Sequence, residues 1–123
     1  MDATQGKGLT KMEITETFTK IFEEEDNASC FQCGKKSRQW AETKHAIFLC
    51  LSCAASYKEI ARVTNVKSIS LDVWTEEELA MLKLGGNKKF KEFLRKYEFE
   101  VSDPKVILKT NAVEYYRQLV TCA

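Results

Sequence analysis

The sequence is poor in the features that mark the more unusual protein classes. Its 123 residues include one proline and five glycines without any low-complexity tract, which excludes collagen-like and disordered chains. No apolar run approaches the roughly 18 residues that a membrane span needs. Lysine and arginine number 19 against 18 for aspartate and glutamate, so charge gives no reason to expect a nucleic-acid or membrane partner. We therefore expect one globular domain.

The amino-terminal stretch also lacks the marks of an exported protein. "MDATQGKGLTKMEITET" contains no apolar signal core, and no arginine precedes Arg38, which is unlike a mitochondrial presequence. We therefore expect a reducing intracellular compartment, the cytoplasm by default. Paired cysteines in such a compartment bind metal ions more often than they form disulfides.

Four of the five cysteines stand in two pairs. Cys30 and Cys33 form one C-x2-C pair, Cys50 and Cys53 form another, and residues 34–49 separate them. Zn²⁺ takes four ligands in a tetrahedron, and each C-x2-C pair supplies two thiolates along one edge of it. Two pairs fill all four positions, so no water stays on the ion to be activated. The spacing predicts one structural Zn²⁺.

Other uses of these cysteines are weaker alternatives. Two disulfides are disfavoured because no secretory signal is present, and a redox dithiol is disfavoured because the two pairs do not resemble a βαβ redox motif. The single histidine, His45, lies between the pairs, and we expect it beside the ligands or at the surface. Cys122 is left over, and we expect it to be a free thiol.

Periodic patterns favour a mostly helical fold with a small β-sheet. "HAIFLCL" at 45–51 predicts a short strand. "KSISLD" at 67–72 alternates and contains β-branched residues, so it predicts a strand or an extended segment. Five other stretches carry apolar residues at the spacing of a helix face that packs on a core. They are Ile14, Phe18, Ile21 and Phe22; Ala55, Tyr57, Ile60 and Ala61; Leu79, Met81 and Leu82; Phe90, Phe93, Leu94 and Tyr97; and Ala112, Tyr115, Tyr116 and Leu119.

Signals for helix ends agree with this pattern. Thr75 followed by Glu78 predicts a capping box at the start of one helix. Gly85 is placed to end that helix in the left-handed conformation, and Asn87 to cap the next one. The Asp-Pro pair at 103–104 fits the cap and first turn of a later helix, and the acidic run "EEEDNAS" at 23–29 predicts a solvated loop.

Further motifs follow the cysteines in a fixed order. Trp40 and Ala41 stand seven and eight residues after Cys33, and "FLCLSC" leads into the second pair. "VKSISLDVW" at 66–74 is followed by "EEL" at 77–79, "GGN" at 85–87 and "YYRQL" at 115–119. This order resembles the zinc-finger domain of the Arf GTPase-activating proteins, whose pattern includes V-R-S-L-T-L-D-x-W. The resemblance implies an ArfGAP-like domain over residues 23–120, with 1–22 as an amino-terminal extension and first helix and 121–123 as a tail.

The resemblance also implies a catalytic position. Members of that family carry an arginine five residues after the last zinc ligand, preceded by a histidine, and this arginine enters the nucleotide site of an Arf-type small GTPase. An arginine finger of this kind accelerates GTP hydrolysis by about 10³ to 10⁵. This sequence has Lys58 at that position and Tyr57 before it. Lysine keeps the positive charge but lacks the planar fork that contacts two oxygens at once.

The departures continue beyond that position. The family's G-V-H-I-S, which helps to form the surface that meets the GTPase, is replaced by "ARVTN" at 61–65. The segment from Cys53 to Asp72 is also one residue shorter than the family pattern. Arg62 lies four residues after Lys58, so we expect it on the same helical face, as a weaker alternative source of the cation.

Three functions are compatible with these observations. The first is a GTPase-activating module for an Arf-type GTPase, and the second is a non-catalytic relative that binds partners or forms part of a larger assembly. The third is a DNA reader, for which Lys35, Lys36, Arg38 and Lys44 give a basic edge, but the balanced charge and the pattern at 74–87 disfavour it. We expect activation of a GTPase to be weak or absent, with no nucleic-acid partner.

Overall fold

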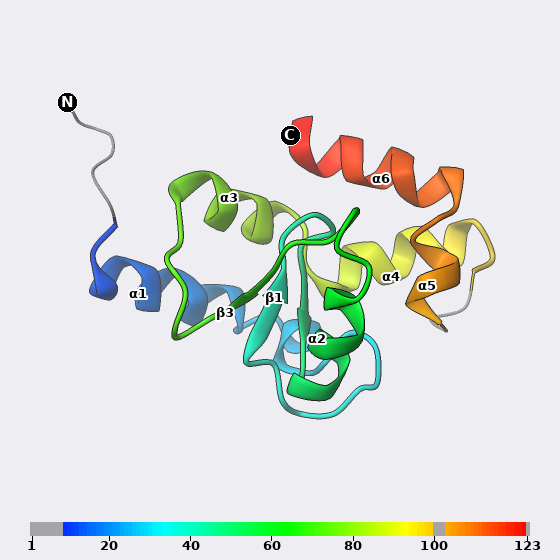
Figure 1. Ribbon diagram of the computed structural model, residues 1–123. Helices are drawn as coiled ribbons and strands as arrows, with labels where there is room; N and C mark the ends of the chain where they lie inside the picture. The colour runs from blue at the N-terminus through cyan, green and yellow to red at the C-terminus, as the bar shows by residue number, and fades with distance from the viewer. Residues whose placement is uncertain (1–8, 100–102, 123) are drawn as a thin grey trace.

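A short antiparallel sheet lies at the centre of the computed structural model, with helices around it (Figure 1). The structure describes residues 9–99 and 103–122, except for the side chains of 121 and 122. The elements in chain order are α1 (Lys11–Ile21), the 3₁₀ turn η1 (Glu25–Ala28), β1 (Trp40–Glu42), β2 (Ile47–Leu49), α2 (Leu51–Lys58), β3 (Val66–Ser68), α3 (Glu76–Leu84), α4 (Asn87–Lys96), α5 (Pro104–Ile107) and α6 (Asn111–Cys122). The predicted fold class, mostly helical with a small sheet, is confirmed.

The sheet has the strand order β2-β1-β3, with both pairings antiparallel. β1 therefore lies in the middle, and Trp40 pairs with Leu49 on one side and with Ser68 on the other. The strand predicted in "HAIFLCL" is confirmed as β2, but the strand predicted in "KSISLD" ends at Ser68, so the prediction was wrong beyond that residue. The chain turns there because the Asp72 carboxylate accepts a hydrogen bond from the Ser68 N–H at 2.6 Å.

Aromatic side chains join the helices to the sheet. Phe18 of α1 meets Trp74 edge to face, with ring centroids 5.2 Å apart. Farther along the chain, Phe90 of α4 lies between Phe31, at 5.1 Å, and Tyr116 of α6, at 4.7 Å. Such contacts add about 0.5–1.5 kcal/mol each to the burial of apolar area. The predicted apolar stripes therefore do form the core, although not every member points inward.

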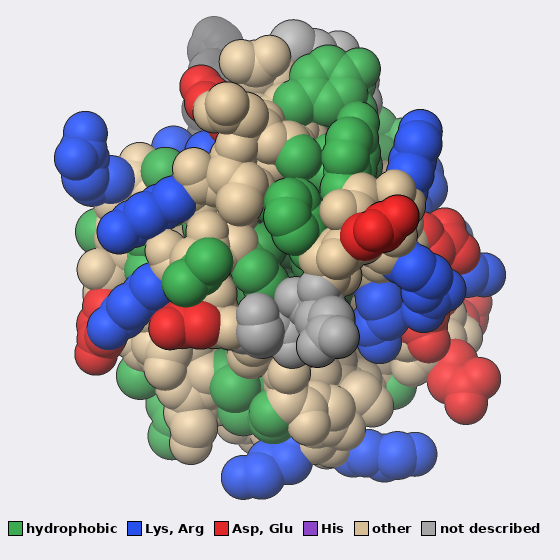
Figure 2. Space-filling model, turned by 90° about the vertical axis from the view of Figure 1, so that its right-hand side faces the viewer, with side chains coloured by type: hydrophobic (Ala, Val, Ile, Leu, Met, Phe, Trp, Pro, Cys, Tyr) green, Lys and Arg blue, Asp and Glu red, His purple; other side chains and the backbone are tan. Residues whose placement is uncertain are grey.

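Three of the predicted helices present a face that differs from the expected one. α2 begins at Leu51 and buries Ala54 and Tyr57, whereas Ala55 and Ala61 are exposed. The outermost residues of two apolar stripes are likewise at the surface. These are Tyr97, which directly follows α4, and Tyr115 and Leu119 of α6. Val113 and Val120 of α6 are buried instead. Figure 2 shows apolar side chains gathered in a strip on the face that carries α4 and α5, with lysine and arginine on both flanks.

Helix caps behave largely as predicted. Thr75 and Glu78 form a complete capping box at α3, and Thr10 and Glu13 form another at α1. The Asp103 side chain accepts from the Lys105 N–H at 3.0 Å, which caps α5. The loop expected in the acidic run contains the single turn η1.

The link between α3 and α4 is where the capping prediction was wrong. Gly85 has φ −88° and is not left-handed; Gly86 takes that conformation, with φ +103°, and is itself the cap of α4. Gly85 is needed for a different reason, since a Cβ there would lie 2.4 Å from the Cβ of Ala46. Asn87 is the first residue of α4, and its side chain turns away from the helix.

Asn87 connects three segments instead of capping a helix. Its Oδ1 accepts from the Phe48 N–H at 2.8 Å, and its Nδ2 donates to the carbonyls of Asp26 and Ser29 at 2.9 and 2.8 Å. Its own N–H donates to the Asn27 side chain at 2.8 Å. One buried amide thus fastens β2 and the turn before the first cysteine pair to the start of α4.

We predict that Asn87→Ala lowers the free energy of unfolding by about 2–4 kcal/mol, because one buried and two partly buried backbone groups lose their partner. Denaturant unfolding followed by circular dichroism measures the loss. The exposed neighbour Lys88 offers a control, since Lys88→Ala should change stability by less than about 0.5 kcal/mol. Equal stability of the two variants would contradict this role for Asn87.

Candidate functional site

The four paired cysteines come together at one point in the fold. The Sγ atoms of Cys30, Cys33, Cys50 and Cys53 all lie within 4.8 Å of one another, and those of Cys33 and Cys50 are 3.7 Å apart. Ligands about 2.3 Å from a tetrahedral ion lie about 3.8 Å from each other. The thiols are free rather than bonded in disulfides. The predicted ligand set therefore forms a cluster with the dimensions of a tetrahedral metal site.

Each cysteine pair is shaped by its own backbone. In the first, the Gly34 N–H donates to the Cys30 carbonyl at 2.9 Å, and Gly34 has φ +81°, a conformation that favours glycine. In the second, Cys50 is the residue that caps α2, and Cys53 lies in the first turn of that helix. The positive end of the helix dipole therefore faces two of the thiols, which favours their ionised form.

The electrostatics of the cluster favour a bound cation. Burial raises the pKa of the Cys30 thiol, and burial together with the charge of Cys30 raises the pKa of Cys53. At Cys50 burial acts in the same direction, but hydrogen bonds from the backbone and thiol of Cys53 outweigh it and lower the pKa to about 7. Four thiolates this close repel one another, so a bound divalent cation is what lets all four ionise.

Lys58 lies in the last turn of the same short helix. Its Nζ stands 4.3 Å from the centroid of the Trp40 ring, at the start of β1, and the side chain is exposed. A lysine over the face of a tryptophan is held by about 0.5–1 kcal/mol at an exposed site. In this structure the Lys58 ammonium therefore packs on the Trp40 ring at the surface of the sheet.

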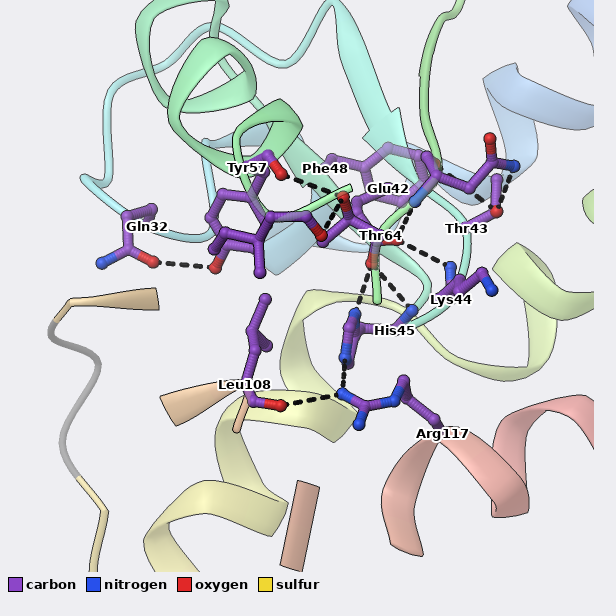
Figure 3. Close-up of polar contacts among 12 residues, drawn as sticks. Gln32, Glu42, Thr43, Lys44, His45, Phe48, Tyr57, Thr64, Leu108 and Arg117 are labelled. Carbon is purple, nitrogen blue, oxygen red and sulfur yellow. Dashed lines mark hydrogen bonds and ion pairs between the residues drawn. The ribbon is translucent and has the colours of Figure 1, made fainter. Parts of the chain in front are cut away.

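Tyr57, next to Lys58, is a buried structural residue, as its place in the apolar pattern of this helix predicted; its hydrogen bond was not predicted. It is 1% exposed, and its O–H donates to the Gln32 Oε1 at 2.8 Å (Figure 3). Burial, and then the charge of Glu42, raises the pKa of the phenol, so the group remains a neutral donor. This contact ties α2 to the loop of the first cysteine pair.

The structure does not place Arg62 with Lys58. α2 ends at Lys58, and Arg62 belongs to the turn that follows, so the prediction that both share a helical face was wrong. The turn closes early because the Thr64 hydroxyl donates to the carbonyls of Tyr57 and Ile60 at 2.9 and 3.0 Å. Arg62 instead lines a surface hollow with Lys44 and Arg117.

Comparison with known proteins gives the family. Residues 15–121 match the ArfGap family, described as "Putative GTPase activating protein for Arf". The chain belongs to the ArfGap family. A similar curated protein is the ADP-ribosylation factor GTPase-activating protein GCS1 of Saccharomyces cerevisiae, 33% identical over 78% of this chain and 28% of its own length. The human stromal membrane-associated protein 1 is 35% identical over 58% of this chain and 15% of its own length.

A solved structure has the same fold as this ArfGap domain. It is described as a "putative GTPase activating protein for ADP ribosylation factor from Cryptosporidium parvum", and the match covers 98% of both chains with a TM-score of 0.87 at 20% identity. Against the two curated relatives, by contrast, the chain spans less than a third of their length. Within the described residues, no helix is both long enough and apolar enough to cross a membrane.

This ArfGap domain also contains a buried polar network that the sequence patterns did not predict. Glu42 and His45 are both 0% exposed, so the surface position, one of the two alternatives expected for His45, was wrong. The His45 ring is instead held between a carboxylate and a guanidinium. Its Nδ1 lies 2.5 Å from the Glu42 Oε1, and its Nε2 lies 3.0 Å from Nη1 of Arg117 (Figure 3). The network links β1 to α6, two elements too far apart in the sequence for a local pattern to connect them.

We predict that Cys30→Ser or Cys50→Ser abolishes metal binding and the native fold, because the metal supplies much of the stability of such a domain. Metal analysis and circular dichroism of the purified variants measure both losses. Cys122→Ser, which leaves the four-thiol cluster intact, is the control and should bind metal normally. A Cys50→Ser protein that stays folded without metal would show that the cluster is not what holds this region together.

Proposed function

We propose that this ArfGap domain binds one structural Zn²⁺ and recognises an Arf-type small GTPase, but activates GTP hydrolysis weakly or not at all. The observation that carries this proposal is the residue at the finger position. Lys58 follows Cys53 by five residues, and it rests on Trp40 as a single ammonium. The protein would act on a GTPase and would not itself be the hydrolase.

Zinc is the ion that best fits the donor set. Four thiolates are soft ligands, a closed tetrahedron has no room for water, and these features together are typical of structural Zn²⁺ sites. The role of such an ion is mechanical. Through Cys50 and Cys53 it would fix the start of α2, and through Cys30 and Cys33 the loop that carries Gln32, so that Lys58 projects from a rigid element.

The expected loss of activity follows from the chemistry of the two cations. An arginine finger contributes about 10³ to 10⁵ in rate, which corresponds to roughly 4–7 kcal/mol of barrier. Its fork contacts two oxygens, whereas an ammonium is more strongly hydrated and offers one point charge. To enter a nucleotide site, Lys58 would also have to leave Trp40 and shed water. We therefore expect the charge of Lys58 alone to accelerate GTP hydrolysis by less than about tenfold.

Binding without catalysis is the second candidate, as a recruited or structural subunit of a larger assembly. The turn between β3 and α3 favours it, because Leu71 and Val73 are 83% and 81% exposed although their neighbour Trp74 is buried. Apolar side chains displayed on a turn that is closed by its own hydrogen bonds, Ser68 N–H to Asp72 and Leu71 N–H to Ser68, suit a protein contact. A reducing intracellular compartment is proposed for either function, since free paired thiols need one.

We predict that the wild-type domain accelerates single-turnover GTP hydrolysis by an Arf-type GTPase less than about tenfold. Lys58→Arg should raise the rate by about ten- to a hundredfold if the surface that meets the GTPase is retained, because the fork is restored. Release of labelled phosphate from the GTP-loaded GTPase measures both.

Lys83→Arg, an exposed substitution of the same kind on α3, is the matched control and should leave the rate unchanged. Brisk hydrolysis by the wild-type domain that Lys58→Ala abolishes would overturn the proposal of weak activity. Binding of the GTP-loaded GTPase with no activation by either protein would favour the binding function.

A further inference from the structure

A groove lies along α1, where the chain that follows β3 crosses this helix on its way to α3 (Figure 1). It has a volume of about 370 Å³. Apolar and hydroxyl-bearing side chains line it, and there is no carboxylate among the described residues of the lining. The apolar residues are Ile14, Phe18, Phe22 and Ile69, and the one cation is Arg38. The groove therefore combines an apolar wall with a single positive charge.

Arg38 has no counter-ion among the residues that the structure describes. Its guanidinium carbon lies 4.0 Å from the centroid of the Phe22 ring, at the end of α1. No hydrogen bond and no ion pair of the described residues involves the Arg38 side chain. A cation–π contact holds a guanidinium over a ring but leaves its charge in place. The groove therefore keeps one unpaired cation at the carboxyl-terminal end of α1.

The Arg38 guanidinium also has an unused hydrogen-bonding capacity. Its Nε is the one buried side-chain nitrogen or oxygen of the described residues that lacks a hydrogen-bond partner. A buried donor without a partner costs free energy, so a group of this kind needs a physical explanation. Because Nε alone of the three nitrogens is buried, both Nη atoms border the solvent. The guanidinium is therefore packed on an aromatic ring with two donor nitrogens accessible to a ligand.

The spacing of the apolar side chains along α1 suits an extended chain. Ile14, Phe18 and Phe22 follow one another every four residues, and a helix rises about 1.5 Å per residue, so they stand about 6 Å apart along the axis. In an extended strand every second side chain lies on the same side, and these side chains are about 6.6 Å apart. Three alternate side chains of an extended peptide therefore match the guanidinium over Phe22, then Phe18, then Ile14.

We propose that this groove binds an extended segment of a partner protein that carries one carboxylate and two apolar side chains at alternate positions. The carboxylate pairs with the two accessible Nη atoms of Arg38, and the guanidinium fork favours such bidentate contacts. The two apolar side chains of the segment pack on Phe18 and Ile14. Thr15 and Ser70 are exposed residues of the same lining, and their hydroxyls offer hydrogen-bond partners to the backbone of the segment.

Other anionic partners suit the groove less well. Nucleic acids and anionic membranes are bound by several cations, whereas Arg38 is the only cation among the described residues of this lining. The groove is also separate from the residues of GTPase activation, because neither Lys58 nor Trp40 lines it. Peptide binding here is therefore a property in addition to the proposed function.

The test is selection of a phage-displayed library of random dodecapeptides on the immobilised protein, with no GTPase present. Selected sequences should share one aspartate or glutamate and apolar residues two and four positions from it. Fluorescence polarisation of the most enriched peptide, labelled with fluorescein, then measures its affinity. Arg38→Gln should bind it at least about tenfold more weakly, since a charge-assisted contact is lost. Lys20→Gln removes the same charge from an exposed position of α1 outside the lining and should bind within about twofold of wild type.

A second variant keeps the proposal testable if Arg38→Gln proves unstable by circular dichroism. Thr19→Glu places a negative charge at an exposed position of the lining and should also weaken binding of the acidic peptide. The proposal is overturned if no acidic and apolar sequence is enriched, or if neither Arg38→Gln nor Thr19→Glu binds more weakly than Lys20→Gln. It is also overturned if sedimentation equilibrium shows a dimer that Arg38→Gln dissociates, since a second copy of the chain would then fill the groove.

Discussion

The geometry of this domain depends on four cysteine thiols that meet at one point in the fold. The cluster joins the loop after η1 to the first turn of α2. From it the hydrogen bond of Tyr57 to Gln32 sets the direction of the helix, and the helix delivers Lys58 to the ring of Trp40. The thiol cluster and the buried Tyr57 thus both anchor the helix that carries Lys58.

A second constraint, the buried carboxylate of Glu42, acts at the other end of β1. It accepts hydrogen bonds from three backbone N–H groups and from His45, so its burial is compensated. The same group holds the turn between β1 and β2 to the turn after α2 and, through His45, contacts the segment that carries Arg117. The thiol cluster and the carboxylate therefore have separate roles: one aims α2, and the other arranges the turns and α6 around β1.

Prediction from the sequence succeeded where the signal is local. The spacing of the cysteines, the capping box of Thr75 and Glu78 and the Asp-Pro start of α5 each depend on residues within a few positions of one another or on a repeated motif. It failed where a side chain binds distant segments. Asn87 bonds to residues 39 and 61 positions away, and His45 to a residue 72 positions away, so their types do not reveal those partners. Arg62 was misplaced because the Thr64 hydroxyl ends the helical run early.

The four-thiol cluster, with the Zn²⁺ that we propose it binds, is the part of the structure on which the rest of the site depends. X-ray absorption at the zinc edge of the purified domain measures the number, type and distance of its ligands directly. We predict one zinc per chain with four sulfur neighbours at about 2.3 Å and no oxygen or nitrogen neighbour. A folded protein without bound metal, or with an ion that keeps a water or nitrogen ligand, would contradict a structural four-thiolate zinc.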